Sequence, residues 1–278
     1  MKYRAYAKIN LSLDVFDVRE DGYHDISSIM VPISFYDELK ISIADKDTYR
    51  CNKSFIRFNE HNSIIKMITI LQDKYDLHDH YAIDLNKTVP IKAGLGGGTA
   101  DAAATLKIFQ RLYKLQMSPE EIIDVCLQVG ADVPFNYCNM PAVVGGIGDQ
   151  ITPFVMKKQY AVLLVKPKSG VSTRKAYELL DMESCDHPDI ERLKGALETG
   201  ASIKGLLGNS LQQPAFVLNK DILAIQKKLA SFGCGEVLMS GSGSTVFCID
   251  EDHSKIRWLY DQLLGSPYYV RLTKTLNH

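Results

Sequence analysis

The chain has 278 residues, which is enough for two domains of ordinary size. Apolar residues make up 46% of the chain and charged residues 23%, so a generally disordered protein is excluded. The formal net charge of −1 gives no overall attraction to nucleic acid or to a membrane surface, and we expect neither as a partner. Any anionic ligand must therefore be held by local groups.

The cysteine pattern and the N-terminal residues favour a cytoplasmic protein. The six cysteines include no Cys-x-x-Cys pair, so we expect reduced, buried thiols. The first residues contain no apolar stretch of signal-peptide length. No apolar run reaches the ~18 residues that a membrane-spanning helix requires.

Residues 3–16 alternate between apolar and polar side chains, which predicts a strand. Its apolar positions from Ile9 to Val15 share one face, and Lys8 and Asn10 lie on the other. A solvated strand face and a ligand-facing site both remain open for these polar residues.

The next polar segment predicts a turn. Asp21-Gly22 is a turn signal, and Tyr23 and His24 follow it where aromatic side chains are able to face a ligand. The plain alternative is an ordinary turn with a half-buried tyrosine. Further strands are predicted at 29–33, at 38–43 and, more loosely, around 55–58.

A helix is predicted from Asn62-Ser63, and either residue is a suitable N-cap. His78 and His80 resemble a metal-binding pair, but they lie in a polar connection and have no third ligand nearby in sequence. We therefore do not predict a metal site there.

The most informative stretch is the glycine run Gly94-Leu-Gly-Gly-Gly98, which precedes an apolar pattern typical of a helix at 101–113. Glycines allow the backbone N–H groups to approach a ligand closely, and the start of a helix attracts anions. Lys87 upstream and Thr99 downstream favour a phosphate site over a plain tight loop. The run matches neither the P-loop nor the dinucleotide-binding fingerprint.

A capping box at Ser118 predicts the next helix, which ends at Gly130. Asp132 then lies between this glycine stop and Pro134, so it belongs to a rigid turn and has either a structural or a catalytic role. The remaining predicted elements are a strand at 160–165, helices at 171–180, 189–198, 202–217 and 219–231, a strand–turn–strand at 236–249, a helix at 253–264 and a strand at 268–274.

Five segments, in the same order and spacing, resemble the motifs of the GHMP kinases. Pro90-x3-Gly-Leu-Gly-Gly-Gly-Thr-Ala-Asp is similar to the ATP-binding motif of that superfamily, and residues 7–13 and 239–245 resemble its first and third motifs. Arg19-x-Asp-Gly-Tyr-His24 resembles the cytidine-binding segment of the diphosphocytidyl methylerythritol kinase branch. Gly130–Phe135 resembles the segment that carries the catalytic aspartate of that branch.

The resemblance implies an α+β fold with the two-domain GHMP kinase architecture. The N-terminal domain, residues 1–155, is expected to mix sheet and helices and to carry the glycine loop that binds ATP. The C-terminal domain, residues 156–278, is expected to contain a ferredoxin-like sheet. The active site is expected between the two domains.

The resemblance also implies residue roles. Asp132 would be the catalytic base, assisted by Lys8, and Asn10 would orient the alcohol. The substrate-binding residues implied are Asn10, Tyr23, His24, Thr173 and Tyr177. The ATP-binding residues implied are Asn62, Lys87, Pro90, Gly94, Leu95, Gly96, Gly97, Gly98, Thr99 and Ala100.

The implied function is ATP-dependent phosphorylation of the 2-hydroxyl of 4-diphosphocytidyl-2-C-methyl-D-erythritol in the methylerythritol phosphate route to isoprenoid precursors. ATP and Mg²⁺ are expected as cofactors, with Thr99 open as an ion ligand or as a helix cap. We expect a monomer or a weak homodimer. One alternative is a GHMP kinase for another small alcohol, against which Tyr23 and His24 argue. The other is a non-catalytic nucleotide-binding homologue, which departures from the family pattern at 136–141 and 209–212 keep open.

Overall fold

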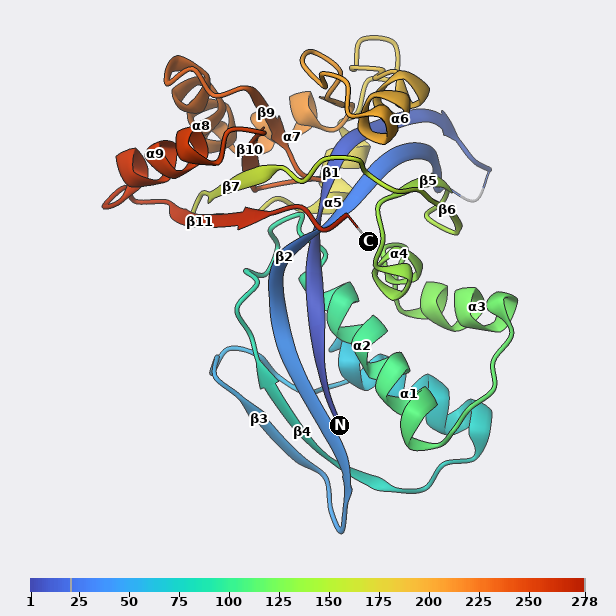
Figure 1. The fold of residues 1–278 in the computed structure, drawn as a ribbon. Helices are drawn as coiled ribbons and strands as arrows, with labels where there is room; N and C mark the ends of the chain where they lie inside the picture. The colour runs from blue at the N-terminus through green and yellow to red at the C-terminus, as the bar shows by residue number, and fades with distance from the viewer. Residues whose placement is uncertain (21, 278) are drawn as a thin grey trace. The chain divides into compact units, whose positions relative to one another are not determined.

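Figure 1 shows the computed structural model, which describes residues 1–20 and 22–277. Contacts within the chain divide it into two compact units, each assembled from several stretches of sequence. The division after residue 155 therefore stays a prediction. Unit 1 consists of Met1–Ala7, Phe35–Pro90 and Gly96–Asn139, and unit 2 consists of Lys8–Ser34, Ile91–Leu95 and Met140–His278.

Two long strands contribute residues to both units. β1 (Lys2–Val18) matches the strand predicted at the N-terminus. β2 (His24–Ala44) replaces the two shorter strands that the sequence predicted for this region. Phe35 and Asp37, in the segment between them, are both buried, so the alternation of β2 continues through a polar buried residue that hides it from sequence analysis.

In unit 1, a sheet is covered by helices that bury one shared core. The C-terminal half of β2 pairs antiparallel with β4, and β4 pairs parallel with β3. Apolar side chains of α1 and α2 pack against the sheet, with Leu39, Ile68, Leu85 and Phe109 among the buried residues (Figure 1). The elements are β3 (Thr48–Cys51), α1 (Ser63–Tyr75), β4 (His80–Asn86), α2 (Gly97–Leu112), α3 (Pro119–Val129) and α4 (Val133–Cys138).

The capping predictions in unit 1 are confirmed, whereas one strand prediction is wrong. The Asn62 side chain accepts a hydrogen bond from the N–H of Ile64, and Ser118 forms the predicted capping box. Residues 55–58 form no strand, because the pairing edge of β4 is taken by Thr48–Cys51 instead.

In unit 2, an antiparallel sheet has the strand order β11-β7-β10-β9. α8 and α9 pack on one face of it (Figure 1), and Leu163, Val165, Ile225 and Leu259 belong to their common core. These elements are β7 (Ala161–Lys166), α8 (Lys220–Ser231), β9 (Glu236–Met239), β10 (Val246–Asp250), α9 (His253–Leu263) and β11 (Tyr269–Lys274).

The rest of unit 2 adds strands to the C-terminal half of β1 and to the N-terminal half of β2. β5 and β6 form a hairpin that pairs with β2, and β8 pairs parallel with β1 at Ser12 and Leu13. The bounds are β5 (Ala142–Gly146), β6 (Gln150–Pro153), α5 (Thr173–Glu178), α6 (Ile190–Thr199), β8 (Gly208–Asn209) and α7 (Gln212–Leu218).

The helix predicted at 202–217 is wrong over its first half. The chain there forms a loop and the short strand β8, and only α7 is helical. Gly205 has a positive φ of 71°, and any Cβ at Gly208 would collide with the Asp186 carboxylate. A left-handed residue and a close backbone approach are both incompatible with the predicted helix.

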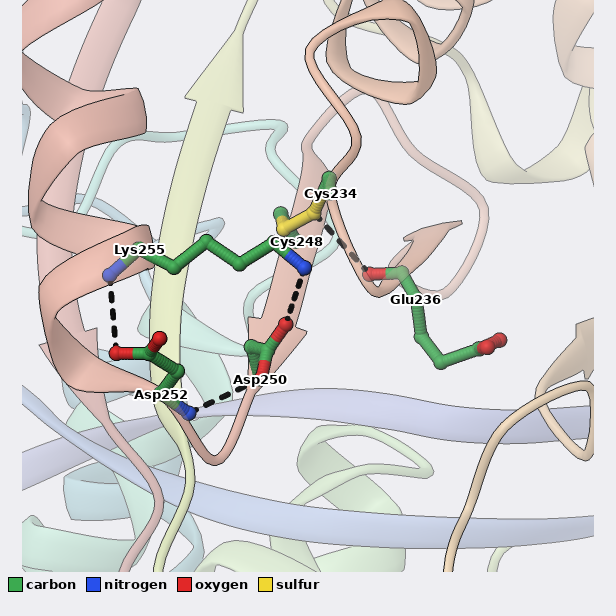
Figure 2. The surroundings of a disulfide bond; sticks show 6 residues. All are labelled: Cys234, Glu236, Cys248, Asp250, Asp252 and Lys255. Atoms are coloured by element: carbon green, nitrogen blue, oxygen red, sulfur yellow. Dashed lines mark hydrogen bonds and ion pairs between the residues drawn. A yellow bond between two sulfur atoms is a disulfide. The ribbon is translucent and has the colours of Figure 1, made fainter.

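Cys234 and Cys248 form a disulfide, so the expectation of reduced thiols is wrong for this pair (Figure 2). Cys234 lies in the turn before β9 and Cys248 lies in β10, and the antiparallel pairing of these strands brings their Cα atoms within 6.3 Å. A spacing of 14 residues gave no hint of this contact. Cys51, Cys126, Cys138 and Cys185 are thiols outside this disulfide. Within residues 1–20 and 22–277, no helix is long and apolar enough to cross a membrane.

Candidate functional site

Lys8 and Asn10 lie side by side on the polar face of β1, as the alternation predicted. Both are almost completely buried, with 3% and 1% of their surfaces exposed. The Lys8 ammonium donates a hydrogen bond to Asn10 Oδ1 at 2.7 Å, and Asn10 Nδ2 donates to Ser28 Oγ at 2.9 Å. An ammonium and an amide buried in this way do not fit a solvated strand face, so these two residues remain candidates for a binding site.

A turn between β9 and β10 packs on these two residues. We call Ser240–Ser244 the serine turn. Ser240 Oγ donates to the Gly94 carbonyl at 2.9 Å and accepts from the Asn10 N–H at 3.3 Å. A Cβ on Gly241 would lie 3.5 Å from Lys8 Nζ, so there is room for little more than a hydrogen atom between the turn and the ammonium. The third predicted motif therefore lies beside the first.

The predicted base-binding residues come together in part. The rings of His24 and Tyr177 are tilted by 43° with centroids 4.8 Å apart, which joins the start of β2 to α5. Tyr23, which directly precedes His24, is 59% exposed. Asp21 of the predicted turn lies outside the described residues.

Thr173 is connected to the serine turn rather than to the aromatic pair. Its hydroxyl lies 2.7 Å from the hydroxyl of Ser242, and either group is able to donate. Thr173 is the first residue of α5, which also carries Tyr177. One short helix therefore relates the turn to the aromatic pair.

The glycine loop, Gly94–Gly98, leads directly into α2. Gly94 and Gly96 have positive φ angles of 73° and 66°, a conformation that glycine adopts without strain. The Leu95 carbonyl accepts from the Lys8 N–H at 3.0 Å. α2 begins at Gly97, four residues before the predicted start, and no side chain caps it. Its first N–H groups are therefore suited to an anion.

Thr99, in the first turn of α2, lies beside Asn136 of α4. The Thr99 hydroxyl is 2.9 Å from the Gly96 carbonyl oxygen and 2.8 Å from Asn136 Oδ1. Its proton is thus directed to a protein acceptor, while a lone pair remains available for a cation. Ala100, the next predicted ATP residue, is buried, with its N–H bonded to Gly96.

Asn62 and Ser63 lie next to the glycine loop in unit 1. Asn62 caps α1, and its Nδ2 donates to the Arg57 carbonyl at 2.9 Å. Ser63 Oγ donates to the Gly98 carbonyl at 2.7 Å. This contact joins the start of α1 to the start of α2.

Lys87 is held beneath the glycine loop by two buried carboxylates. Its ammonium donates to Asp37 Oδ2 at 2.6 Å and to Asp101 Oδ2. A Cβ placed on Gly97 would lie 3.3 Å from Lys87 Nζ. Asp37 also accepts the N–H groups of Thr88 and Val89, which lead to Pro90. The predicted point charge of Lys87 is therefore already paired within the protein.

The pKa values of Lys87 and Asp101 are both shifted upward. Burial alone would lower the pKa of Lys87, but the carboxylates of Asp101 and Asp37 raise it. Complete burial raises the pKa of Asp101 to about 7, although Lys87 opposes this shift. Asp101 Oδ1 is buried and has no hydrogen-bond partner. Two carboxyls for one ammonium leave one excess negative charge, which protonation of Asp101 removes.

Asp132 stands at the start of α4 in unit 1. Its side chain makes no capping hydrogen bond, and its carbonyl accepts from the Asn136 N–H at 3.1 Å. The interpretation of Asp132 as a helix cap is therefore not supported. Its predicted pairing with Lys8 joins two different units and stays a prediction.

The discounted histidine pair has ordinary surface partners. His78 Nε2 lies 3.1 Å from Asp76, and His80 Nδ1 lies 3.2 Å from Asp47. Over the described parts of the chain, no group of three or more histidine, cysteine or acidic side chains is arranged to hold a metal.

Two family models match this chain. GHMP kinases N terminal domain matches residues 62–152, and GHMP kinases C terminal matches residues 182–269. A 4-diphosphocytidyl-2-C-methyl-D-erythritol kinase of Clostridium kluyveri is 35% identical over 99% of this chain and 100% of its own. The chain belongs to the GHMP kinases, in the 4-diphosphocytidyl-2-C-methyl-D-erythritol kinase family. The predicted family and the predicted two-domain α+β kinase fold are thus confirmed.

Other GHMP kinases agree with this assignment. The Geobacillus thermodenitrificans protein of the same name is 36% identical over 95% of this chain and 93% of its own. The crystal structure of a 4-(cytidine 5'-diphospho)-2C-methyl-D-erythritol kinase superposes with a TM-score of 0.83 at 27% identity, covering 99% of this chain and 100% of the other. The structure of L. major mevalonate kinase, at 14% identity and a TM-score of 0.72, covers 100% of this chain and 96% of its own. At that identity the likeness concerns the fold alone.

Several residues that support the site were missed from the sequence. They are polar and buried, and their roles depend on partners that only the fold brings to them. The serine turn lies in the predicted third motif, but the same residues are also typical of an ordinary glycine hairpin, so its serines were not predicted as site residues. The residues missed are Ser28, Asp37, Asp101, Asn136, Asn209, Ser240 and Ser242.

Proposed function

We propose that this protein transfers the γ-phosphoryl group of ATP to the 2-hydroxyl of 4-diphosphocytidyl-2-C-methyl-D-erythritol. The observation that carries the proposal is the buried Lys8 ammonium, which donates to Asn10 Oδ1 at 2.7 Å and lies close to the serine turn. A cation kept in this way is suited to a developing negative charge. Family membership supplies the reaction class and the substrate.

The proposed chemistry assigns one role to each polar group. Asp132 accepts the proton of the attacking hydroxyl as general base. Lys8 favours the ionised form of Asp132 and stabilises the charge on the transferring group. Asn10 Oδ1 lies 2.7 Å from Lys8, so this amide orients the ammonium and the alcohol together. Phosphoryl transfer depends mainly on such positioning.

In the proposed ATP site, the phosphates lie against the N–H groups at the start of α2. Gly96 and Gly97 let the backbone approach, and the helix N-terminus supplies a positive potential. Pro90, Gly94, Leu95, Gly98 and Ala100 complete the loop, with Asn62 at its edge. We assign Lys87 an indirect role, because its two carboxylate partners already balance its charge.

The residues fit Mg²⁺ that enters with ATP. Such an ion keeps most of its ligands from phosphate and water and needs one or two from protein. The Thr99 hydroxyl has an available lone pair at the start of α2, and Asp132 supplies a carboxylate. When bound, Mg²⁺ neutralises charge on the β- and γ-phosphates.

We propose that His24 and Tyr177 receive the cytosine ring, with Tyr23 closing over it. Aromatic faces stack on a base, and a neutral imidazole offers one donor and one acceptor to its edge. The link from Thr173 to Ser242 would then place the diphosphate side of the substrate near the serine turn.

ADP release with and without 4-diphosphocytidyl-2-C-methyl-D-erythritol tests the proposal, with ³¹P NMR of the product to identify the phosphorylated hydroxyl. We expect ADP release that depends on this substrate and a new phosphomonoester signal. Turnover of homoserine or mevalonate instead would favour a kinase for another alcohol. ATP binding without ADP release from any alcohol would favour a nucleotide-binding module. We further propose that the protein acts in the cytoplasm as a monomer or weak homodimer.

A further inference from the structure

Asn209 of β8 is a buried residue whose side chain is fully engaged. Only 1% of its surface is exposed. Its Nδ2 donates to the Met239 carbonyl at 2.8 Å and to the Gly241 carbonyl at 2.9 Å. Its Oδ1 accepts from the Leu211 N–H at 2.9 Å. An amide NH₂ has two protons, and each of them is used by a different carbonyl.

These two carbonyls lie on either side of Ser240, at the start of the serine turn. Ser240 in turn bonds to Asn10 and to Gly94. The Cβ position of Gly241 is 3.4 Å from Asn10 Oδ1 and 3.5 Å from Lys8 Nζ. The serine turn is therefore close to both side chains, and its hydrogen bond from the Asn10 N–H to Ser240 Oγ joins it directly to β1.

β8 is well placed to hold the turn in one position. It pairs parallel with β1, the strand that carries Lys8 and Asn10. The Asn209 N–H donates to Asp186 Oδ2 at 3.1 Å, and the Ser210 N–H donates to the Leu13 carbonyl at 2.9 Å. Asn209 thus joins the serine turn to β8, which pairs with β1, the strand on which the turn packs.

We propose that Asn209 is a positioning residue for the transfer step, acting through the serine turn on Lys8 and Asn10. The inference rests on the proposed function for its kinetic consequence, though not for its structural one. A neutral double donor holds the turn without placing a charge beside the Lys8 ammonium. No other protein side chain of this size offers two N–H donors and one acceptor without a charge.

The kinetic test compares Asn209→Asp with Asn209→Ser. Aspartate has the same shape but cannot donate when ionised, and serine is too short to bond both carbonyls. We expect kcat to fall ~10–100-fold in both variants, as for a small misplacement of catalytic groups, with KM for ATP unchanged within about twofold. A kcat within twofold of wild type in either folded variant would overturn the proposal.

A matched control separates positioning from loss of stability. Leu259→Ala removes a buried side chain of α9 in the same unit, away from the serine turn. It should lower the unfolding midpoint and leave kcat per folded molecule unchanged. The Asn209 effect should also shrink in an Asn10→Ala background, because both changes disturb one group of contacts. Full additivity would instead assign Asn209 to the fold alone.

Hydrogen exchange without any ligand tests the structural part independently of the reaction. In Asn209→Asp and Asn209→Ser we expect faster exchange at the N–H groups of Ser240, Thr245 and Asn10, with α9 unchanged. Leu259→Ala should show the reverse pattern. If wild type fails to phosphorylate the cytidine substrate, the proposed function is lost, while this exchange pattern still decides whether Asn209 holds the turn. Unchanged exchange at the turn in both variants would refute it.

Discussion

The glycine loop and the serine turn are both built from small residues, but the groups behind them differ. Behind the start of α2 lie three buried ionisable residues, Asp37, Lys87 and Asp101. The serine turn is held by amides and hydroxyls, with Asn209 bonded to the carbonyls of Met239 and Gly241 on either side of Ser240. One region is supported by charge and the other by neutral hydrogen bonds.

The difference follows from what each region has to hold. The start of α2 is proposed to hold phosphates through backbone N–H groups, so the charged residues behind it serve to fix the backbone. The Cβ position of Gly241 lies 3.5 Å from Lys8 Nζ, so the serine turn is close to the ammonium. A carboxylate in the turn would interact strongly with that charge, whereas amides and hydroxyls hold the turn without adding a charge there.

The largest effect is expected from the catalytic pair. Asp132→Asn and Lys8→Ala should each lower kcat by ~10²–10⁴-fold, because each removes a group that acts on the transferred proton or charge. Steady-state assays with both substrates should show little change in either KM. The loss of kcat in the double variant should be much smaller than the product of the two single losses. Independent effects would mean that Lys8 serves the nucleotide or the strand rather than the base.

Removal of the disulfide tests whether the serine turn depends on the far end of its hairpin. Cys234→Ser opens a loop with a sequence separation of 14, which a chain-entropy argument values at ~3 kcal/mol of unfolding free energy. Urea unfolding should show this loss, and kcat should stay near wild type if Asn209 fixes the turn locally. Thiol titration of denatured wild type without reductant should count four thiols and, after reduction, six. A large fall in kcat would show that the hairpin as a whole supports the site.

The glycine loop is best probed at Gly98. A Cβ there meets only Ser63 Oγ, at 3.4 Å, whereas one on Gly97 would lie 2.9 Å from a Val89 methyl. Gly98→Ala should therefore keep the fold. It should weaken ATP binding ~10–100-fold, because the added methyl group keeps a phosphate from its charge-assisted contact with the backbone N–H. Calorimetric titration with ATP measures this. Gly195→Ala in α6, where a Cβ meets open space, is the control and should bind ATP normally. Normal affinity in Gly98→Ala would place the phosphates elsewhere.

The aromatic pair belongs to the unit of the serine turn and should affect one substrate only. His24→Ala and Tyr177→Ala each remove a ring worth ~1–3 kcal/mol of base stacking. KM for the cytidine substrate should rise accordingly, and KM for ATP should not change. Trp258→Ala breaks another aromatic contact of unit 2, with Phe232, and should change neither constant. A higher KM for ATP in His24→Ala would contradict the cytosine assignment.

The sequence predicted those parts of the site whose residues are close together along the chain. The glycine loop, the polar face of β1 and the caps at Asn62 and Ser118 each depend on spacings of a few residues. Local propensity and periodicity are informative over such distances. The start of α2 was placed too late, because glycines are poor helix formers whatever the fold imposes.

The residues behind the site could not be predicted, because they meet through tertiary contacts. Asp37 reaches Lys87 across 50 residues, and Asn209 reaches Gly241 across 32. The same applies to the disulfide and to β8, where close packing of Gly208 prevents the predicted helix. A buried polar residue has no periodic signature of its own. Its partners must be known before its role is visible.

The smallest effect is expected in the pH dependence of the free energy of unfolding. It should distinguish the charged residues behind the glycine loop from the neutral ones behind the serine turn. The pKa of Asp101 is raised by burial from 3.8 to about 7, so the folded protein binds this proton more tightly than the unfolded chain does. Stability from this carboxyl is therefore present at acidic pH and lost as pH rises from about 4 towards 7. Asp101→Asn has no such proton, so its stability relative to wild type should rise across that window. Urea unfolding of both proteins at several pH values measures the difference, while Asn209→Ser, which changes only neutral groups, should differ from wild type by a constant amount. A constant difference for Asp101→Asn would mean that Lys87 keeps Asp101 ionised in the folded protein, and that both regions are supported without a titrating group.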